Sequence, residues 1–96
     1  MPEWMQDILK DLMILHLYAF GRVAQAQYLL PQEEDRMAQA QSHVDANDPD
    51  PSWKAMLDRL TAEVARLRLE LKTWTDRYTT SGNLLQQFDV VVPFRV

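Results

Sequence analysis

The sequence contains no cysteine, which excludes disulfide bridges and thiolate metal sites. It also lacks a long apolar run, since the longest one, Leu12–Phe20, has nine residues and includes His16. A membrane-spanning helix needs about twenty apolar residues, so this run predicts a buried helix and no membrane partner. The first residues include an acid and no base, which argues against a secretory signal. We therefore expect a cytoplasmic protein.

Patterns typical of catalysis and metal binding are absent as well. Neither Glu-x-x-His nor Glu-x-x-Asp occurs, and these are spacings with which small helical enzymes hold iron or magnesium. His16 has no acid or second histidine three or four residues away. We expect it to be a core histidine with one hydrogen bond, and we expect His43 to stand alone near an acidic loop. The sequence thus predicts no catalytic residue, no metal and no cofactor.

An apolar stripe with alternating steps of four and three residues is the strongest pattern present. Its members are Trp53, Leu57, Leu60, Val64, Leu67, Leu71, Trp74 and Tyr78. Side chains at these spacings share one face of a helix, so the stripe predicts a coiled-coil-like seam. We expect the seam either to pack inside a bundle or to pair with a second copy. Its tryptophans should lie against small residues, in the region from Ala19 to Ala26.

The first helix is expected over residues 3–30, and its apolar residues cover the whole circumference between Leu12 and Phe20. A helix that is apolar all round is enclosed on several sides. A chain of 96 residues with one or two further helices can hardly enclose it, which favours an oligomer or an obligate partner. Gly21 in this pattern predicts a close approach by another backbone or a large ring.

Proline and turn-forming residues predict the boundaries that follow. Pro31 cannot continue the hydrogen-bond ladder of the first helix. Residues 31–45 therefore form a second helix, or continue the first beyond a kink. Residues 45–52 are rich in Asp, Asn, Pro and Ser, and predict a loop.

The helix that carries the seam is expected over residues 52–80, with Asp50 or Ser52 as its N-cap and Gly82 just after its last turn. Residues 83–96 become β-branched and extended, and their apolar end should tuck into the bundle or pair with a partner. The predicted fold is one mainly α domain over residues 1–96. It is an antiparallel helical hairpin or a three-helix bundle with a short extended C-terminal tail, and we expect a dimer.

The net charge of −4 is unevenly distributed. Residues 31–58 hold seven acids and two bases, a net of −5, whereas residues 59–96 hold six bases and four acids, a net of +2. Such asymmetry can steer a partner, but it does not favour direct binding to nucleic acid.

These observations favour a non-enzymatic protein–protein interaction module: an adaptor, a chaperone-like subunit or an inhibitor of a larger protein machine. It would act as a helical homodimer and also bind an unidentified protein. The residues expected to mediate self-association are Ile8, Leu12, Leu15, Leu57, Leu60, Val64, Leu67, Leu71 and Trp74. Those expected to bind the other protein are Glu33, Glu34, Asp35, Asp48, Asp50, Trp53 and Phe94. One alternative is an acidic inhibitor that imitates nucleic acid, and another is a small helical enzyme with a site in the bundle core.

Overall fold

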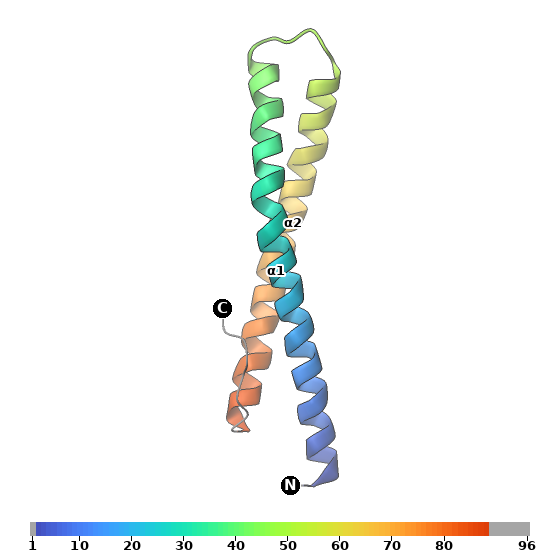
Figure 1. Cartoon of the computed structure of the whole chain (residues 1–96), viewed down its shortest axis with the longest axis vertical. Helices are drawn as coiled ribbons and strands as arrows, with labels where there is room; N and C mark the ends of the chain where they lie inside the picture. The colour runs from blue at the N-terminus through green and yellow to red at the C-terminus, as the bar shows by residue number, and fades with distance from the viewer. Residues whose placement is uncertain (1, 89–96) are drawn as a thin grey trace. The chain divides into compact units, whose positions relative to one another are not determined.

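The computed structural model describes residues 2–88, which contain two α-helices and no strand (Figure 1). Helix α1 runs over Glu3–Asp45 and helix α2 over Ser52–Gln87. The expected mainly α class is confirmed, and a helical hairpin fits the element order. No third helix is present between residues 2 and 88. The apolar end of the expected tail, residues 89–96, lies outside the described residues.

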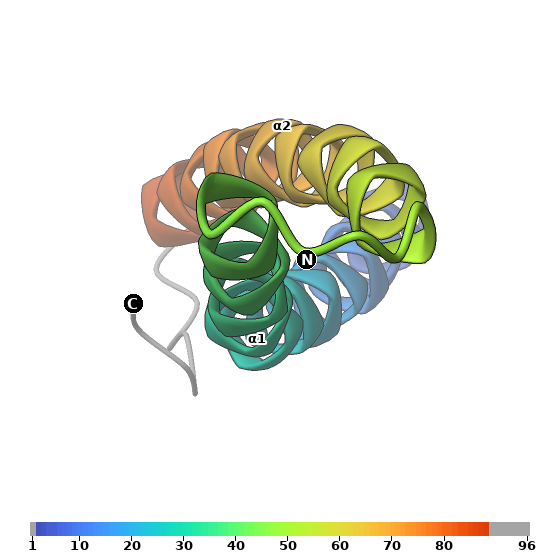
Figure 2. The same ribbon diagram turned by 90° about the horizontal axis from the view of Figure 1, so that it is seen from above.

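Two compact units make up the chain, and each contains a part of both helices. Unit 1 combines the chain up to Ala24 with the chain from Leu71 onward, and unit 2 is Gln25–Glu70. In unit 2 a short loop joins α1 to α2 as an antiparallel hairpin (Figure 2). In unit 1 the first half of α1 lies antiparallel to the second half of α2, because His16 contacts Ser81, whereas Arg22, further along α1, lies over Trp74, which comes earlier in α2.

Helix α1 continues through Pro31, so the separate helix considered for residues 31–45 does not form. The proline lacks an N–H and crowds the carbonyl of Gln27, which costs about 3 kcal/mol in a helix interior. Burial on both sides of Pro31 offsets this cost. Ala26 before the proline and Ala40 after it are both buried within unit 2. The continuous helix keeps both of these side chains on its buried face.

The end of α1 is a Schellman motif, a common way to terminate a helix. Asn47 adopts the left-handed conformation, with φ of 56°. The Asn47 N–H donates to the carbonyl of Val44 at 3.1 Å, and the Asp48 N–H donates to the carbonyl of His43 at 3.1 Å. Asparagine tolerates this conformation better than most residues. The loop expected over residues 45–52 is therefore confirmed, and its first turn is set by Asn47.

The start of α2 is capped by Asp50, one of the two N-caps expected. Its carboxylate accepts a hydrogen bond from the N–H of Ser52 at 3.0 Å. Helix α2 then extends to Gln87, so the predicted end near residue 80 is wrong, and Asn83 and its neighbours are helical. Gly82 lies inside the helix and has no positive φ.

The glycine of α2 is there for a different reason. A Cβ atom at Gly82 would lie 3.1 Å from Cε1 of His16, so the absence of a side chain lets the imidazole come close to the α2 backbone. At Gly21, by contrast, an added Cβ would meet nothing within 4 Å among the described residues. The close approach predicted at Gly21 is wrong for this part of the chain, and it occurs at Gly82 instead.

The apolar stripe of α2 faces α1 in both units, and this part of the prediction is confirmed. In unit 2, Leu60, Val64 and Leu67 are buried. In unit 1, Tyr78 forms a buried cluster with Ala19 and Val23, and half-buried Phe20, Leu71 and Trp74 pack against it. Trp74 therefore lies by a small residue as expected. Trp53 does not, because its ring stacks on His43 in unit 2.

Candidate functional site

His16 is the most deeply enclosed polar side chain of unit 1, with 1% of its surface exposed. The Ser81 hydroxyl donates to the carbonyl of Tyr78 at 3.0 Å, and Ser81 Oγ lies 2.7 Å from Nδ1 of His16. Since the hydroxyl has a single proton, the imidazole must donate from Nδ1 to Ser81. The prediction of a core histidine with one hydrogen bond is confirmed.

The remaining surfaces of the His16 ring are covered by α2. The imidazole stacks on Tyr78, with ring centroids 4.2 Å apart and planes 20° apart, and Gly82 lies against its edge. Its Nε2 atom is buried and has no hydrogen-bond partner within residues 2–88. An enclosed ring with this geometry holds α1 and α2 together in unit 1, and it presents no nitrogen to solvent.

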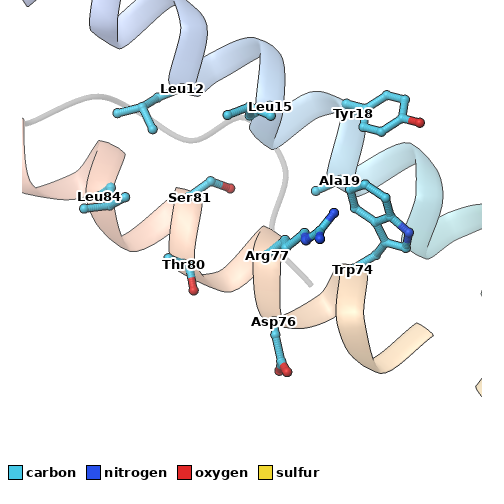
Figure 3. Close-up of a pocket in the computed structure, with 10 residues that line it drawn as sticks. All are labelled: Leu12, Leu15, Tyr18, Ala19, Trp74, Asp76, Arg77, Thr80, Ser81 and Leu84. Carbon is cyan, nitrogen blue, oxygen red and sulfur yellow. The ribbon is translucent and has the colours of Figure 1, made fainter. Parts of the chain in front are cut away.

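An open groove lies beside this cluster, between α1 and α2 of unit 1 (Figure 3). Its volume is about 490 Å³. The residues that line it are Leu12, Leu15, Tyr18, Ala19, Trp74, Asp76, Arg77, Thr80, Ser81 and Leu84. Arg77 extends between the helices toward Trp74, whereas Asp76 and Thr80 point away from α1 (Figure 3). The surface offered by the groove is therefore mainly apolar, with one guanidinium.

Exposed apolar side chains extend the groove along both helices. On α1 the exposed fractions are 61% for Trp4, 47% for Ile8, 58% for Leu15 and 55% for Tyr18. These positions follow steps of four and three residues, and the stripe that they form also contains Asp11 and Arg22. Leu84 near the end of α2 and Phe88 just after this helix are exposed as well. We call the stripe Trp4, Ile8, Asp11, Leu15, Tyr18 and Arg22 the outer stripe of α1.

One end of the groove is positively charged. The guanidinium carbon of Arg77 lies 4.6 Å from the centre of the Trp74 ring, and that of Arg22 lies 5.3 Å from it. Tyr18 meets the same ring edge-on, at 5.2 Å between centroids. Guanidinium groups over an indole gain about 0.5–1 kcal/mol each at exposed sites. Trp74 thus fixes two cations at the end of an apolar surface.

The residues predicted to mediate self-association do not form one surface. Leu60, Val64 and Leu67 are buried in unit 2, and Leu57 there is half-buried. In unit 1, Leu12 and Trp74 are half-buried groove residues, Leu71 packs on the buried cluster, and Ile8 and Leu15 are exposed. The seam of α2 is therefore covered by α1 of the same chain, and the open surface belongs to the outer stripe of α1.

The residues predicted to bind another protein lie in unit 2, apart from Phe94, which is outside the described residues. Glu33 pairs with Arg36 at 3.4 Å, and Glu34 pairs with Arg68 of α2 at 3.5 Å. Asp35 is exposed on α1. These carboxylates do not gather into a single acidic face with the loop acids, which are used to build the loop.

The loop acids form a clasp with His43, which the sequence did not predict. Asp48 Oδ2 lies 3.0 Å from Nδ1 of His43, and the imidazole stacks on Trp53 at 3.7 Å with nearly parallel planes. The backbone N–H of Asp50 donates to the other Asp48 oxygen at 3.0 Å. This backbone hydrogen bond, and then the one with His43, hold the pKa of Asp48 below its ordinary value of 3.8. The expectation that His43 stands alone is wrong.

Replacing Asp48 by asparagine should change how stability depends on pH in acid. Because the pKa of Asp48 is lowered by folding, its stabilising contribution is present above the ordinary value of 3.8 and disappears as pH falls through the folded value. The gap in unfolding free energy between wild type and Asp48→Asn should thus narrow below about pH 4. Urea unfolding between about pH 2 and 6 measures it, with Asp58→Asn as control. A gap that widens in acid would contradict the clasp.

Sequence reasoning missed two features of unit 1. Nothing in the sequence placed Tyr18, Leu84 and Arg77 around one groove. The signal available was the outer stripe of α1, whose steps of four and three residues from Trp4 to Arg22 repeat the pattern of the seam. The pairing of His16 with Ser81 had no sequence signal, because the two residues are 65 positions apart.

Within residues 2–88, no three histidine, aspartate or glutamate side chains come close enough to hold a metal ion. Neither α1 nor α2 combines the length and apolarity that crossing a membrane requires. No family model, curated protein or solved structure matches the chain.

Proposed function

We propose that this chain is a non-enzymatic protein–protein interaction module that acts as a helical homodimer through unit 1. The observation that supports this most is the open apolar surface made by the groove and the outer stripe of α1. Helix α1 is apolar on nearly all sides between Leu12 and Phe20, and α2 covers only one side of it. Ile14, Leu15, Leu17 and Tyr18 remain exposed in that run. A further polypeptide is the natural cover for such a surface.

The size of this surface fits a dimer interface. With about 150–250 Å² per aromatic side chain and somewhat less per aliphatic one, the exposed parts of Trp4, Ile8, Leu15, Tyr18, Leu84 and Phe88 amount to roughly 600 Å². The largest apolar patch on a typical monomer is about 300–600 Å². A standard interface buries about 800 Å² per partner. Groove floor and polar rim would supply the difference.

The chemistry of the groove argues for binding and against catalysis. Ser81 donates its hydroxyl proton to the backbone of Tyr78, and His16 is enclosed behind it. Asp76 points away from the groove (Figure 3). A reaction site needs a nucleophile and a base that converge on one point beside a substrate. The groove residues offer an apolar floor and a cation instead.

The self-association is tested by light scattering at micromolar concentration. The wild-type protein should have about twice the chain mass of 11.2 kDa, and Leu15→Asp should give the mass of a single chain. A charge placed in a desolvated interface costs several kcal/mol, which is more than tenfold in the dissociation constant. Leu69→Asp is the matched control, because Leu69 is an exposed leucine of unit 2, 65% accessible. A wild-type protein that is monomeric at these concentrations would refute the proposal.

A second surface of α1 suits the other protein that an adaptor would bind. Ile14 and Leu17 are exposed at 57% and 40%, yet neither belongs to the outer stripe. Successive helix positions are about 100° apart, so Leu17 faces away from Leu15, whereas Ile14 lies at the edge of the outer stripe beside Tyr18. Occupation of the groove by a second copy would therefore leave Leu17 accessible.

A further inference from the structure

We propose that the groove of unit 1 holds helix α1 of a second copy, antiparallel to the α1 that lines it, with Asp7 and Asp11 of each copy facing Arg77 of the other. This inference rests on the homodimer proposed above and specifies its interface.

The outer stripe of α1 has a shape that suits pairing with a second copy. The stripe is both a wall of the groove, through Leu15 and Tyr18, and a projecting ridge, through Trp4, Ile8 and Leu15. A surface that carries ridge and groove side by side can pair with itself about a two-fold axis, each ridge entering the other groove. Its steps of four and three residues suit packing along a neighbouring helix.

The distribution of charge favours one direction for the second helix. Acids occupy the beginning of α1, at Glu3, Asp7 and Asp11, and all three are exposed. Two cations, Arg77 of the groove and Arg22 of the outer stripe, lie at the other end, beside Trp74. In a parallel pair the acids of one copy would lie beside the same acids of the other copy. The arginines of the two copies would also lie beside each other. In an antiparallel pair the acids of one copy meet the arginines of the other, which is the complementary arrangement.

The same direction gives a consistent register along the outer stripe. When the two-fold axis passes between Asp11 and Leu15, Ile8 of one copy lies opposite Tyr18 of the other. Trp4 then lies opposite Arg22, an aromatic ring against a cation. Asp7 falls at the level of Ala19, beside which Arg77 extends (Figure 3). Ile8 and Tyr18 thus gain apolar neighbours and Trp4 a cationic one, while Leu15 lies opposite Asp11.

Charge reversal on the full chain tests this arrangement. The first variant is Arg77→Glu and the second combines Asp7→Lys with Asp11→Lys. Each alone should raise the dimer dissociation constant by about tenfold or more, because like charges then face each other twice in the symmetric dimer. Mixing the two variants should restore the affinity, since each interface contact in the heterodimer joins opposite charges. Sedimentation and native mass spectrometry measure the affinities and the fraction of heterodimer.

Matched controls separate this effect from net charge and from folding. Lys72→Glu changes the charge of an exposed α2 residue outside the groove, and Asp58→Lys does so in unit 2. Both should leave the dissociation constant within about twofold of the wild type. Helical content by circular dichroism, unchanged in all variants, shows that α1 and α2 still form.

The outcomes are distinct for each competing arrangement. A wild-type dimer whose single charge variants bind as tightly as the wild type overturns the antiparallel interface, while the homodimer itself stands. A monomeric wild type overturns both. Truncation after Phe88 should leave the dissociation constant unchanged. A truncated chain that dimerises more tightly would show that residues 89–96 occupy the groove, and would also overturn the proposal.

Discussion

Leu85→Ala is expected to lower the free energy of unfolding by about 2–5 kcal/mol, the range found for leucines in well-packed cores. Leu85 is a large side chain with 0% exposure, on the turn of α2 that follows Ser81 in unit 1. Truncation removes three carbons from water-excluded packing and leaves a cavity that the two helices can only partly close. Small cores such as this one have few other contacts with which to compensate.

The measurement is urea unfolding followed by circular dichroism, at one fixed protein concentration because dimer formation adds to apparent stability. Leu69→Ala is the control, since Leu69 is the exposed leucine of α2 in unit 2 and its loss should cost less than about 0.5 kcal/mol. Equal losses at Leu85 and Leu69 would mean that Leu85 does not form part of a packed core.

The same exchange at the two glycines should have opposite effects. Gly82→Leu is expected to lower the free energy of unfolding by about 1–3 kcal/mol, the usual cost of overpacking. Even the Cβ atom would lie 3.1 Å from the His16 ring, and the larger side chain must displace the imidazole and break its hydrogen bond to Ser81. Gly21→Leu should instead raise the free energy of unfolding by up to about 1 kcal/mol, because leucine favours a helix more than glycine does. A Cβ atom added at position 21 would also meet no described atom within 4 Å.

Thermal unfolding of both variants, beside the wild type, provides the comparison. Stabilisation by Gly82→Leu would show that close packing of the His16 ring against the α2 backbone is not required for stability. Destabilisation by Gly21→Leu would show that this position of α1 is covered in solution, by the second copy or by the rest of the chain.

The helices could be predicted from the sequence because their determinants are local and periodic. The seam of α2, the loop at residues 45–52 and the Asp50 cap depend on spacings and side chains within a few residues. The helix end expected near residue 80 and the break considered at Pro31 have a common cause. Pro31 and Gly82 usually end helices, but here their local cost is outweighed by packing between α1 and α2, which no short sequence window contains.

The candidate site was predictable only in outline. Exposure of Ile8 and Leu15 agrees with the expectation of more apolar surface than the chain covers. Their neighbours in the groove, Arg77 and Leu84, come from α2 about 60 to 70 positions later, so only the pairing of the helices brings them together. The seam pattern predicted a self-association surface mainly on α2, whereas the open surface lies mainly along α1.

The two units differ in how the chain must close to form them. Unit 2 is one continuous segment, Gln25–Glu70, whose halves meet across a short loop. Unit 1 joins the chain before Gln25 to the chain after Glu70, so its contacts close a much longer stretch of polypeptide and carry a larger loss of chain entropy. Local contacts form faster than distant ones. The hairpin of unit 2 should accordingly be the folding nucleus, and the groove should appear only in the last step of folding.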